Sequence, residues 1–207
     1  MPEALVVAAI RWESVAPLVL ASAAIMGSPG PATISLVAVV AAYGVRRSLP
    51  YLLGLIVGSA LVLFAVAAGI TATLLAVPAL RSVLIALSAA YILWLAYHIA
   101  TAPPLSAEGA AADAPSLAGG TVLGVANPKA WVAMSAVFAS ARLADTAATD
   151  AAAKTAVLSV MIVLIMTAWL VAGASLAPML RDPRRARMIN AALAAALIAA
   201  TALAVLH

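Results

Sequence analysis

The sequence predicts an all-α integral membrane protein with six transmembrane helices. It predicts a 3+3 inverted repeat in which the first and fourth helices are broken. Three observations lead to this fold class. Hydrophobic residues make up 67% of the chain and charged residues only 9%, whereas a soluble domain is about 25% charged. Apolar runs of bilayer-spanning length recur along the chain. Two of these runs are interrupted by proline and glycine at corresponding places in the two halves.

The six apolar runs lie at about 15–42, 49–76, 79–101, 117–141, 155–178 and 187–206. A polar, proline-rich linker at 102–116 divides them three and three. We therefore expect one transmembrane domain over 1–207, with halves at about 1–101 and 117–207. Because three is odd, the second half enters the membrane with the opposite orientation to the first, which predicts inverted repeats.

Basic residues between the runs predict the orientation. Loops at 43–48, 102–116 and 179–186, with Arg187 at the boundary, hold six basic residues, and the opposite side holds four (Arg46, Arg47, Arg181, Arg184, Arg185 and Arg187 against Arg11, Arg81, Arg142 and Lys154). Cytoplasmic loops carry the excess of lysine and arginine. The first set is thus expected in the cytoplasm and both termini outside. Loops are also expected at 142–154 and 181–187.

The first break is Met26-Gly-Ser-Pro-Gly-Pro-Ala-Thr33, inside an uncharged run from Ser14 to Val45. Serine is a good helix N-cap and proline a good first helical residue. Ser28 can therefore cap a second half-helix that Pro29 or Pro31 opens, and we expect it to run from Pro29 to Tyr43.

The second break is Asn127-Pro128-Lys129. Lys129 is the one charged residue between 114 and 141, and a lysine at mid-bilayer costs about 3 kcal/mol on insertion scales. Asn127 suits an N-cap and Pro128 the first helical position. We expect one half-helix to end here and another to run from Pro128 to Arg142.

Two helix N-termini that meet near one point form an anion site, because each carries unpaired N–H groups and about half a positive charge. Lys129 adds a full charge, and no Asp or Glu lies inside the six runs. A substrate carboxylate is the expected partner. The predicted substrate-binding residues are Ser28, Pro29, Gly30, Pro31, Thr33, Asn127, Pro128 and Lys129, with Gly58, Ser59 and Thr121 as further candidates to line the cavity.

Each assignment has a structural alternative. Lys129 could snorkel to an interface or bind backbone carbonyls freed by Pro128. Gly54 and Gly58, four residues apart, suit close helix packing. The hydroxyls of Thr33, Ser59 and Thr121 could bond back to their own helices.

Several classes of function are disfavoured. The chain has no cysteine, which excludes disulfides, iron–sulfur clusters and thiolate metal sites. Arginines clustered in loops orient a membrane protein and do not indicate a nucleic-acid partner. No intramembrane carboxylate pair or histidine pair is present to act as a catalytic base, so we expect no enzyme, no bound cofactor and no resident metal.

An ordered set of short motifs resembles the LysE/RhtB family of bacterial amino-acid exporters. The motifs are Ser28-Pro-Gly-Pro31, Tyr43-Gly-Val-Arg-Arg47, Gly54-Leu-Ile-Val-Gly58, Ser88-Ala-Ala-Tyr-Ile-Leu-Trp-Leu95 and Asn127-Pro-Lys129. Their order and spacing hold over nearly the whole chain.

The resemblance implies a multi-pass inner-membrane transporter that moves amino acids or related small metabolites outward, driven by the proton gradient. It also implies contact with membrane lipid and a small bundle that can form a homodimer. Where members of the family often carry an acidic residue after the glycine of the second span, this chain has Ser59. The alternative function is transport of divalent metal ions, which wider relatives of the family handle.

Overall fold

A computed structural model describes residues 10–70, 78–102 and 114–206, and all regular structure in these segments is helical. The α-helices are α1 (Val15–Ile25), α2 (Pro31–Tyr43), α3 (Val45–Ala67), α5 (Pro78–Ala100), α6 (Leu117–Ala126), α7 (Pro128–Ser140), α8 (Ala147–Leu176) and α9 (Pro183–Leu206). Short 3₁₀ turns precede α1 at Trp12–Ser14 and follow α8 at Ala177–Arg181.

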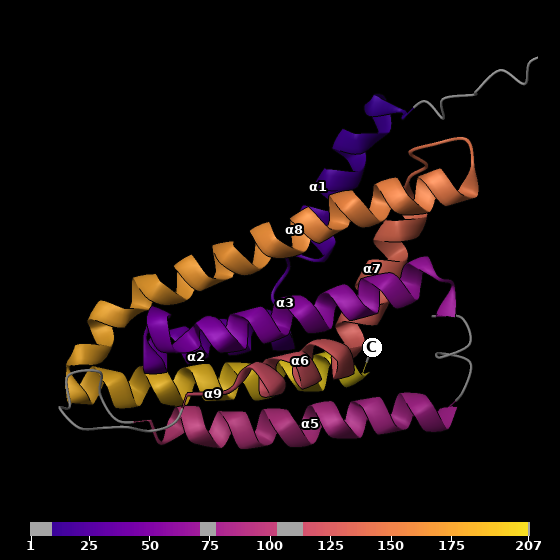
Figure 1. The fold of residues 1–207 in the computed structure, drawn as a ribbon. Coiled ribbons are helices and arrows are strands. Elements are labelled where there is room, and N and C mark those ends of the chain that lie inside the picture. Colours follow the sequence, from indigo (N-terminus) through magenta and orange to yellow (C-terminus); the bar gives the residue numbers. More distant parts are fainter. Residues whose placement is uncertain (1–9, 71–77, 103–113, 207) are drawn as a thin grey trace, which may run out of the picture.

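Both predicted breaks are confirmed. α1 and α2 are separated by residues 26–30, and α6 and α7 meet at Asn127 with a bend of 60°. In Figure 1, α1 and α7 both lie steeply above the roughly parallel α2, α3, α5, α6 and α9; the chain descends along α1 to the first break and ascends along α7 from the second. α8 has 30 residues and crosses α2 and α3 diagonally. At 1.5 Å per residue it is about 45 Å long, which exceeds the hydrocarbon thickness unless it tilts.

Three of the expected loops are shorter than predicted. Loop 43–48 is a turn at Gly44, whose φ of +79° suits glycine, and α3 already begins at Val45. α8 begins at Ala147 inside the expected loop 142–154. There the i, i+4 ion pair between Lys154 and Asp150, with Nζ and Oδ2 2.7 Å apart, lets two charged residues lie in its first turns. α9 begins at Pro183, directly after Asp182 accepts the N–H groups of Arg184 and Arg185.

The most extensive contact between helices joins α3 to α6 through glycine. A Cβ on Gly58 would lie 2.5 Å from the Thr121 carbonyl oxygen and 2.9 Å from the Gly124 Cα, so a side chain there would clash. Gly54 and Gly120 face each other in the same way one turn earlier. The backbones of α3 and α6 therefore touch, which confirms the packing interpretation of the four-residue glycine spacing.

Two of the three connections predicted for the same side lie at one end of the bundle, and most of the third, 102–116, lies outside the described residues. The α2–α3 and α8–α9 connections lie at one end, on the left in Figure 1, where Leu180 and Ala186 pack against Ala41. At the other end, Arg11 pairs with Asp145 in the α7–α8 connection at 2.5 Å. The shared side of the basic loops 43–48 and 179–186 is thus confirmed.

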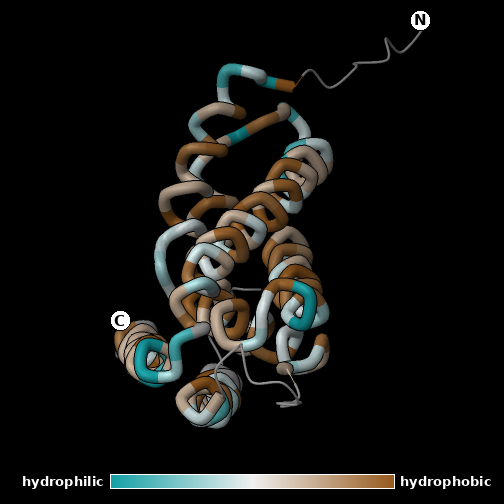
Figure 2. The backbone as a smooth tube through the Cα atoms, turned by 90° about the vertical axis from the view of Figure 1, so that its left-hand side faces the viewer, coloured by the Kyte–Doolittle hydropathy of each residue, from teal (hydrophilic) through white to brown (hydrophobic). Residues whose placement is uncertain are grey.

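The surface has the character of a membrane protein. Leu53, Val57, Leu61 and Phe64 form a stripe on α3 that is about half exposed, and soluble monomers rarely expose such a contiguous apolar patch. Figure 2 shows hydrophobic residues around the long helices and hydrophilic colour mainly near helix ends.

Three described helices are long and apolar enough to cross a bilayer: Val45–Ala67, Ala147–Leu180 and Pro183–Leu203. The bent pair of α6 and α7 would be a fourth span. Trp12–Ile25, Pro31–Tyr43 and Ile85–Ala100 are shorter apolar helices. The chain therefore has several membrane-spanning helices, and the count of six in an inverted repeat stays a prediction.

Candidate functional site

The first break has a local reason for its shape. Gly30 is extended, with φ −168° and ψ 179°, because the ring of a following proline disfavours the helical conformation. The helix therefore begins at Pro31. The Thr33 hydroxyl accepts the Gly30 N–H at 2.9 Å and donates to the Gly30 carbonyl at 3.1 Å. Of the two predicted first residues, Pro31 is confirmed and Pro29 is wrong, and the predicted capping role of Ser28 is also wrong, since Gly30 is the N-cap residue.

The second break follows the prediction closely. Asn127 is the N-cap of α7, and its side-chain oxygen accepts the Lys129 N–H at 3.1 Å. Pro128 occupies the first helical position. The indole N–H of Trp131 donates to the Val125 carbonyl at 2.7 Å, which satisfies a carbonyl at the end of α6.

Lys129 joins the two breaks across a hundred residues of sequence. Its Nζ donates to the Ser28 carbonyl at 2.5 Å, the Ser28 hydroxyl at 2.8 Å and the Pro29 carbonyl at 3.0 Å. Its stem lies against Gly30, where a Cβ would come within 2.6 Å of the lysine Cδ. Lys129 thus binds carbonyls of the first break and not those that Pro128 frees.

A second side chain also holds the first break. Trp169 of α8 donates its indole N–H to the Gly27 carbonyl at 3.1 Å. The carbonyls of three consecutive residues, Gly27, Ser28 and Pro29, are therefore bound by side chains of the second half. The unwound backbone is fixed by long-range partners, as non-helical backbone at membrane depth requires.

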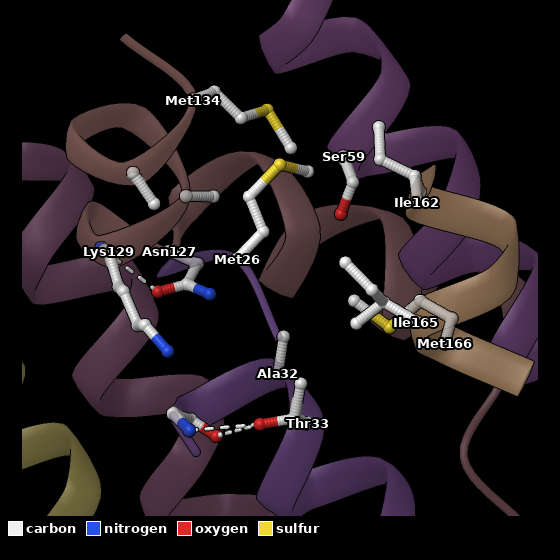
Figure 3. Close-up of a pocket in the computed structure, with 13 residues that line it drawn as sticks. Met26, Ala32, Thr33, Ser59, Asn127, Lys129, Met134, Ile162, Ile165 and Met166 are labelled. Carbon is white, nitrogen blue, oxygen red and sulfur yellow. Dashed lines mark hydrogen bonds between the residues drawn. The ribbon is translucent and has the colours of Figure 1, made fainter. Parts of the chain in front are cut away.

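A small cavity of about 40 Å³ lies between the breaks. It has a polar wall at Asn127, Lys129 and Thr33, and Ser59 of α3 faces it (Figure 3). The remaining wall is apolar and comes from four elements: Met26, Ala32, Ala130, Ala133, Met134, Ile162, Ile165 and Met166. A cavity of this size holds roughly three water molecules.

A larger groove of about 1020 Å³ reaches the same lysine from another direction. It is lined by the first break, the start of α7, Ile85 of α5 and the last turns of α9 from Ala196 to Leu203. The groove therefore runs from the breaks toward the end of the bundle where α5 begins and α9 ends (Figure 1). Gly30, Lys129 and Ala133 line both spaces.

The structure brings together most of the predicted site residues. Thr33, Asn127 and Ser59 line the small cavity, whereas Ser28, Pro29, Pro31 and Pro128 line the groove. Gly58 and Thr121 lie in the α3–α6 contact and line neither space. The role of these residues in binding a substrate stays a prediction.

The apolar residues that line the cavity were missed, as were the two tryptophans that bind the breaks. Trp131 and Trp169 had a usable signal, because tryptophan is enriched at membrane interfaces and both stand well inside apolar runs. Met26, Met134 and Met166 had none, since methionine in an apolar run looks the same on a cavity wall as on a lipid-facing surface.

Lys129 is the charged side chain among the residues that line the cavity and the groove. Neither the cavity nor the groove is lined by an Asp or Glu, and the described partners of the Lys129 ammonium group are neutral oxygens. Among the described residues, no group of three or more His, Cys, Asp or Glu side chains is placed to hold a metal ion.

Most of the chain matches a known protein family. Residues 23–207 match a family model described as LysE type translocator. No curated protein and no solved structure matches the chain. The matched range contains both breaks, the small cavity and the groove.

Proposed function

Because the chain belongs to the LysE type translocator family, we propose that it exports amino acids or related small metabolites across the bacterial inner membrane. The family consists of membrane translocators, and the apolar helices make the chain a multi-pass membrane protein. The export direction, the inner-membrane location, coupling to protons and a six-span inverted repeat are parts of this proposal.

The observation that carries the proposal is the position of Lys129. An intramembrane ionisable residue marks a substrate or ion pathway by default, and this one lines both the cavity and the groove. Its described partners are neutral, so its charge stays uncompensated until an anion arrives. The first turn of α2 also lines the cavity at Ala32 and Thr33, and first-turn N–H groups have no acceptor inside their helix. A substrate carboxylate binds near this turn and the lysine.

The hydrogen bonds of Lys129 suggest how binding is linked to movement. In this structure the ammonium group holds Ser28 and Pro29, and so holds the first break against the second. When a substrate carboxylate binds the ammonium group, the hydrogen bonds from Lys129 to the Ser28 and Pro29 carbonyls break. The half-helices then separate, which exposes the substrate to the other side of the membrane. Lys129 is the titratable side chain that lines both spaces, so a proton that drives transport acts through it.

The unequal ends of the bundle support alternating access. The groove extends from the two breaks to the end of the bundle where α9 terminates. Between the breaks and the other end, the buried Tyr51 hydroxyl donates to Ser35 at 3.0 Å, and α3 touches α6. With the basic loops in the cytoplasm, this structure is the outward-facing form.

Efflux from proteoliposomes loaded with a labelled amino-acid mixture tests the proposal. We expect the wild type to export a subset of the mixture. Lys129→Met should abolish export while it still inserts into the membrane. Ser140→Met, at the exposed end of the same helix, is the matched control and should export normally. Equal efflux from Lys129→Met and wild type would refute the carboxylate site, and a wild type that exports no amino acid would refute the substrate class.

A further inference from the structure

Ser59 is the polar side chain of the cavity that no structural role accounts for. It is 3% exposed and its hydroxyl points into the space between the cavity walls (Figure 3). Thr33, Ser35 and Thr121 donate their hydroxyls to carbonyls of their own helices or caps. No described hydrogen bond uses the Ser59 hydroxyl. Buried hydroxyls nearly always have a hydrogen-bond partner. Because the described residues supply none for Ser59, its hydroxyl is free to bind a ligand.

The wall around Ser59 is apolar and deformable. Met26 and Met134 lie on one side of the cavity, and Ile162, Ile165 and Met166 of α8 lie on the other (Figure 3). Methionine is unbranched and has three rotatable bonds, so it adapts its shape to different apolar groups. The cavity of about 40 Å³ is smaller than an amino acid. The side chains of the wall therefore have to move to admit an amino acid, and methionine side chains can do so at little cost in free energy.

The charges of the cavity limit the substrate further. Lys129 supplies one positive charge, and no acidic side chain lines the cavity. The terminal ammonium of a lysine-like substrate would lie among methionines without a counter-ion, and a second carboxylate would be equally unpaired. Charged groups in such a site are strongly disfavoured unless they are paired.

Building on the proposed function, we infer that the substrate is a neutral amino acid with an apolar side chain. Ser59 is a specificity-determining residue, because its hydroxyl oxygen accepts a hydrogen bond from the substrate ammonium group. The carboxylate binds at Lys129, and the substrate side chain lies among Met26, Met134 and Met166. The hydroxyl accepts a hydrogen bond from the α-ammonium, whose charge is balanced by the neighbouring carboxylate of the substrate itself. A second ammonium group has no such counter-ion, and the hydroxyl offers no charge to hold it.

Counterflow of labelled leucine into proteoliposomes, with unlabelled amino acids as competitors, tests this inference. We expect leucine and methionine to compete about tenfold or more better than serine, since contacts of a few methylene groups give discrimination of this size. Lysine and glutamate should compete equally poorly, because their second charged group would be unpaired in the cavity. Ser59→Asp adds a carboxylate to the cavity and should improve competition by lysine at least about tenfold. Ser59→Asn has nearly the same volume without the charge and should not.

The outcomes separate this inference from the proposed function. A wild type that transports amino acids but prefers lysine, serine or glutamate would refute the inference and leave the exporter intact. An inserted Ser59→Asp variant with no gain for lysine would refute the role of Ser59. If Ser59→Asp does not insert, Met166→Gln gives a second measurement. It should reduce the preference for leucine over serine, and an unchanged preference would refute the apolar site.

Discussion

The contact between Gly30 and Lys129 gives a prediction whose size follows from the structure. An alanine Cβ at position 30 would lie 2.6 Å from Cδ and 3.0 Å from Nζ of Lys129, and its three nearest neighbours are all atoms of that side chain. The backbone of Gly30 is extended and suits alanine. Gly30→Ala should therefore displace the lysine and break its three hydrogen bonds. At about 0.6 kcal/mol for each bond inside a membrane, the loss in unfolding free energy is about 2 kcal/mol.

A double-mutant cycle isolates this contact. Gly30→Ala also changes the N-cap and the entropy of the unfolded chain, by up to about 1 kcal/mol each. Both effects persist when Lys129 is replaced, so they cancel in the cycle. We expect Gly30→Ala to cost about 2 kcal/mol less in a Lys129→Ala background than in the wild type. Reversible unfolding in detergent micelles measures all four proteins.

A control comes from a glycine that packs against backbone. A Cβ on Gly173 would lie 2.9 Å from the Val37 carbonyl oxygen, and its three nearest neighbours all belong to Val37 and Val40 of α2. Gly173→Ala should therefore cost the same in both backgrounds. If the Gly30→Ala cost is also the same in both, Lys129 does not hold the first break and the linkage between binding and movement fails.

Three further predictions concern packing, access and pH. Gly58→Val should destabilise the protein by at least about 2 kcal/mol, because its Cβ meets backbone atoms of α6. Val57→Leu on the exposed face should change the unfolding free energy by less than about 0.5 kcal/mol. If Gly58→Val and Val57→Leu change it equally, the close contact between α3 and α6 at Gly58 is refuted. In this cysteine-free chain, Ala199→Cys in the groove should react with an impermeant maleimide from outside intact cells. Ser175→Cys, at the opposite end of the bundle, should not, and the reverse pattern would invert the orientation. Hydrogen bonds from the N–H groups of Arg185 and Arg184 lower the pKa of Asp182. The contribution of Asp182 to the free energy of unfolding is therefore fully present above its pKa in the unfolded chain, near 3.9. It is lost as the pH falls through the lower pKa in the folded protein. Asp182→Asn should remove that part of the acid-induced loss of stability, and identical pH profiles would refute it.

The positions of the breaks could be predicted because proline and glycine act locally. Asn127 and Pro128 have the geometry that an N-cap and a first helical residue require, so the second break follows from three residues. The first break holds two prolines, and the sequence does not decide between them by propensity alone. The restriction that Pro31 places on Gly30 moves the helix start to the later proline.

The partners of Lys129 and the cavity walls could not be predicted. Its acceptors are backbone carbonyls and a hydroxyl about a hundred residues away, and backbone atoms leave no mark in the sequence. The cavity walls are hidden for a different reason. A helix that is apolar all round has no periodicity to separate its inward side from its lipid side. Met166 and the exposed Leu164 of α8 therefore look alike in the sequence.

α8 begins inside the predicted loop 142–154 because the charged residues there are paired. Asp150 accepts the Leu143 N–H at 2.5 Å and pairs with Lys154 one turn later. These bonds let the helix extend into a polar segment. Only the spacing of four residues between the two charges indicates a helix there.

The glycine contact between α3 and α6 has a consequence for biosynthesis. Gly58 and its neighbour Gly124 are separated by 66 residues of chain. At 5–20 residues per second the ribosome adds this length in roughly 3–13 s. The other large helix contacts, α5 with α9 and α2 with α8, also join an early helix to a late one. We therefore expect the first three spans to enter the bilayer with uncovered packing faces, and the insertion machinery has to shield them until the second half arrives.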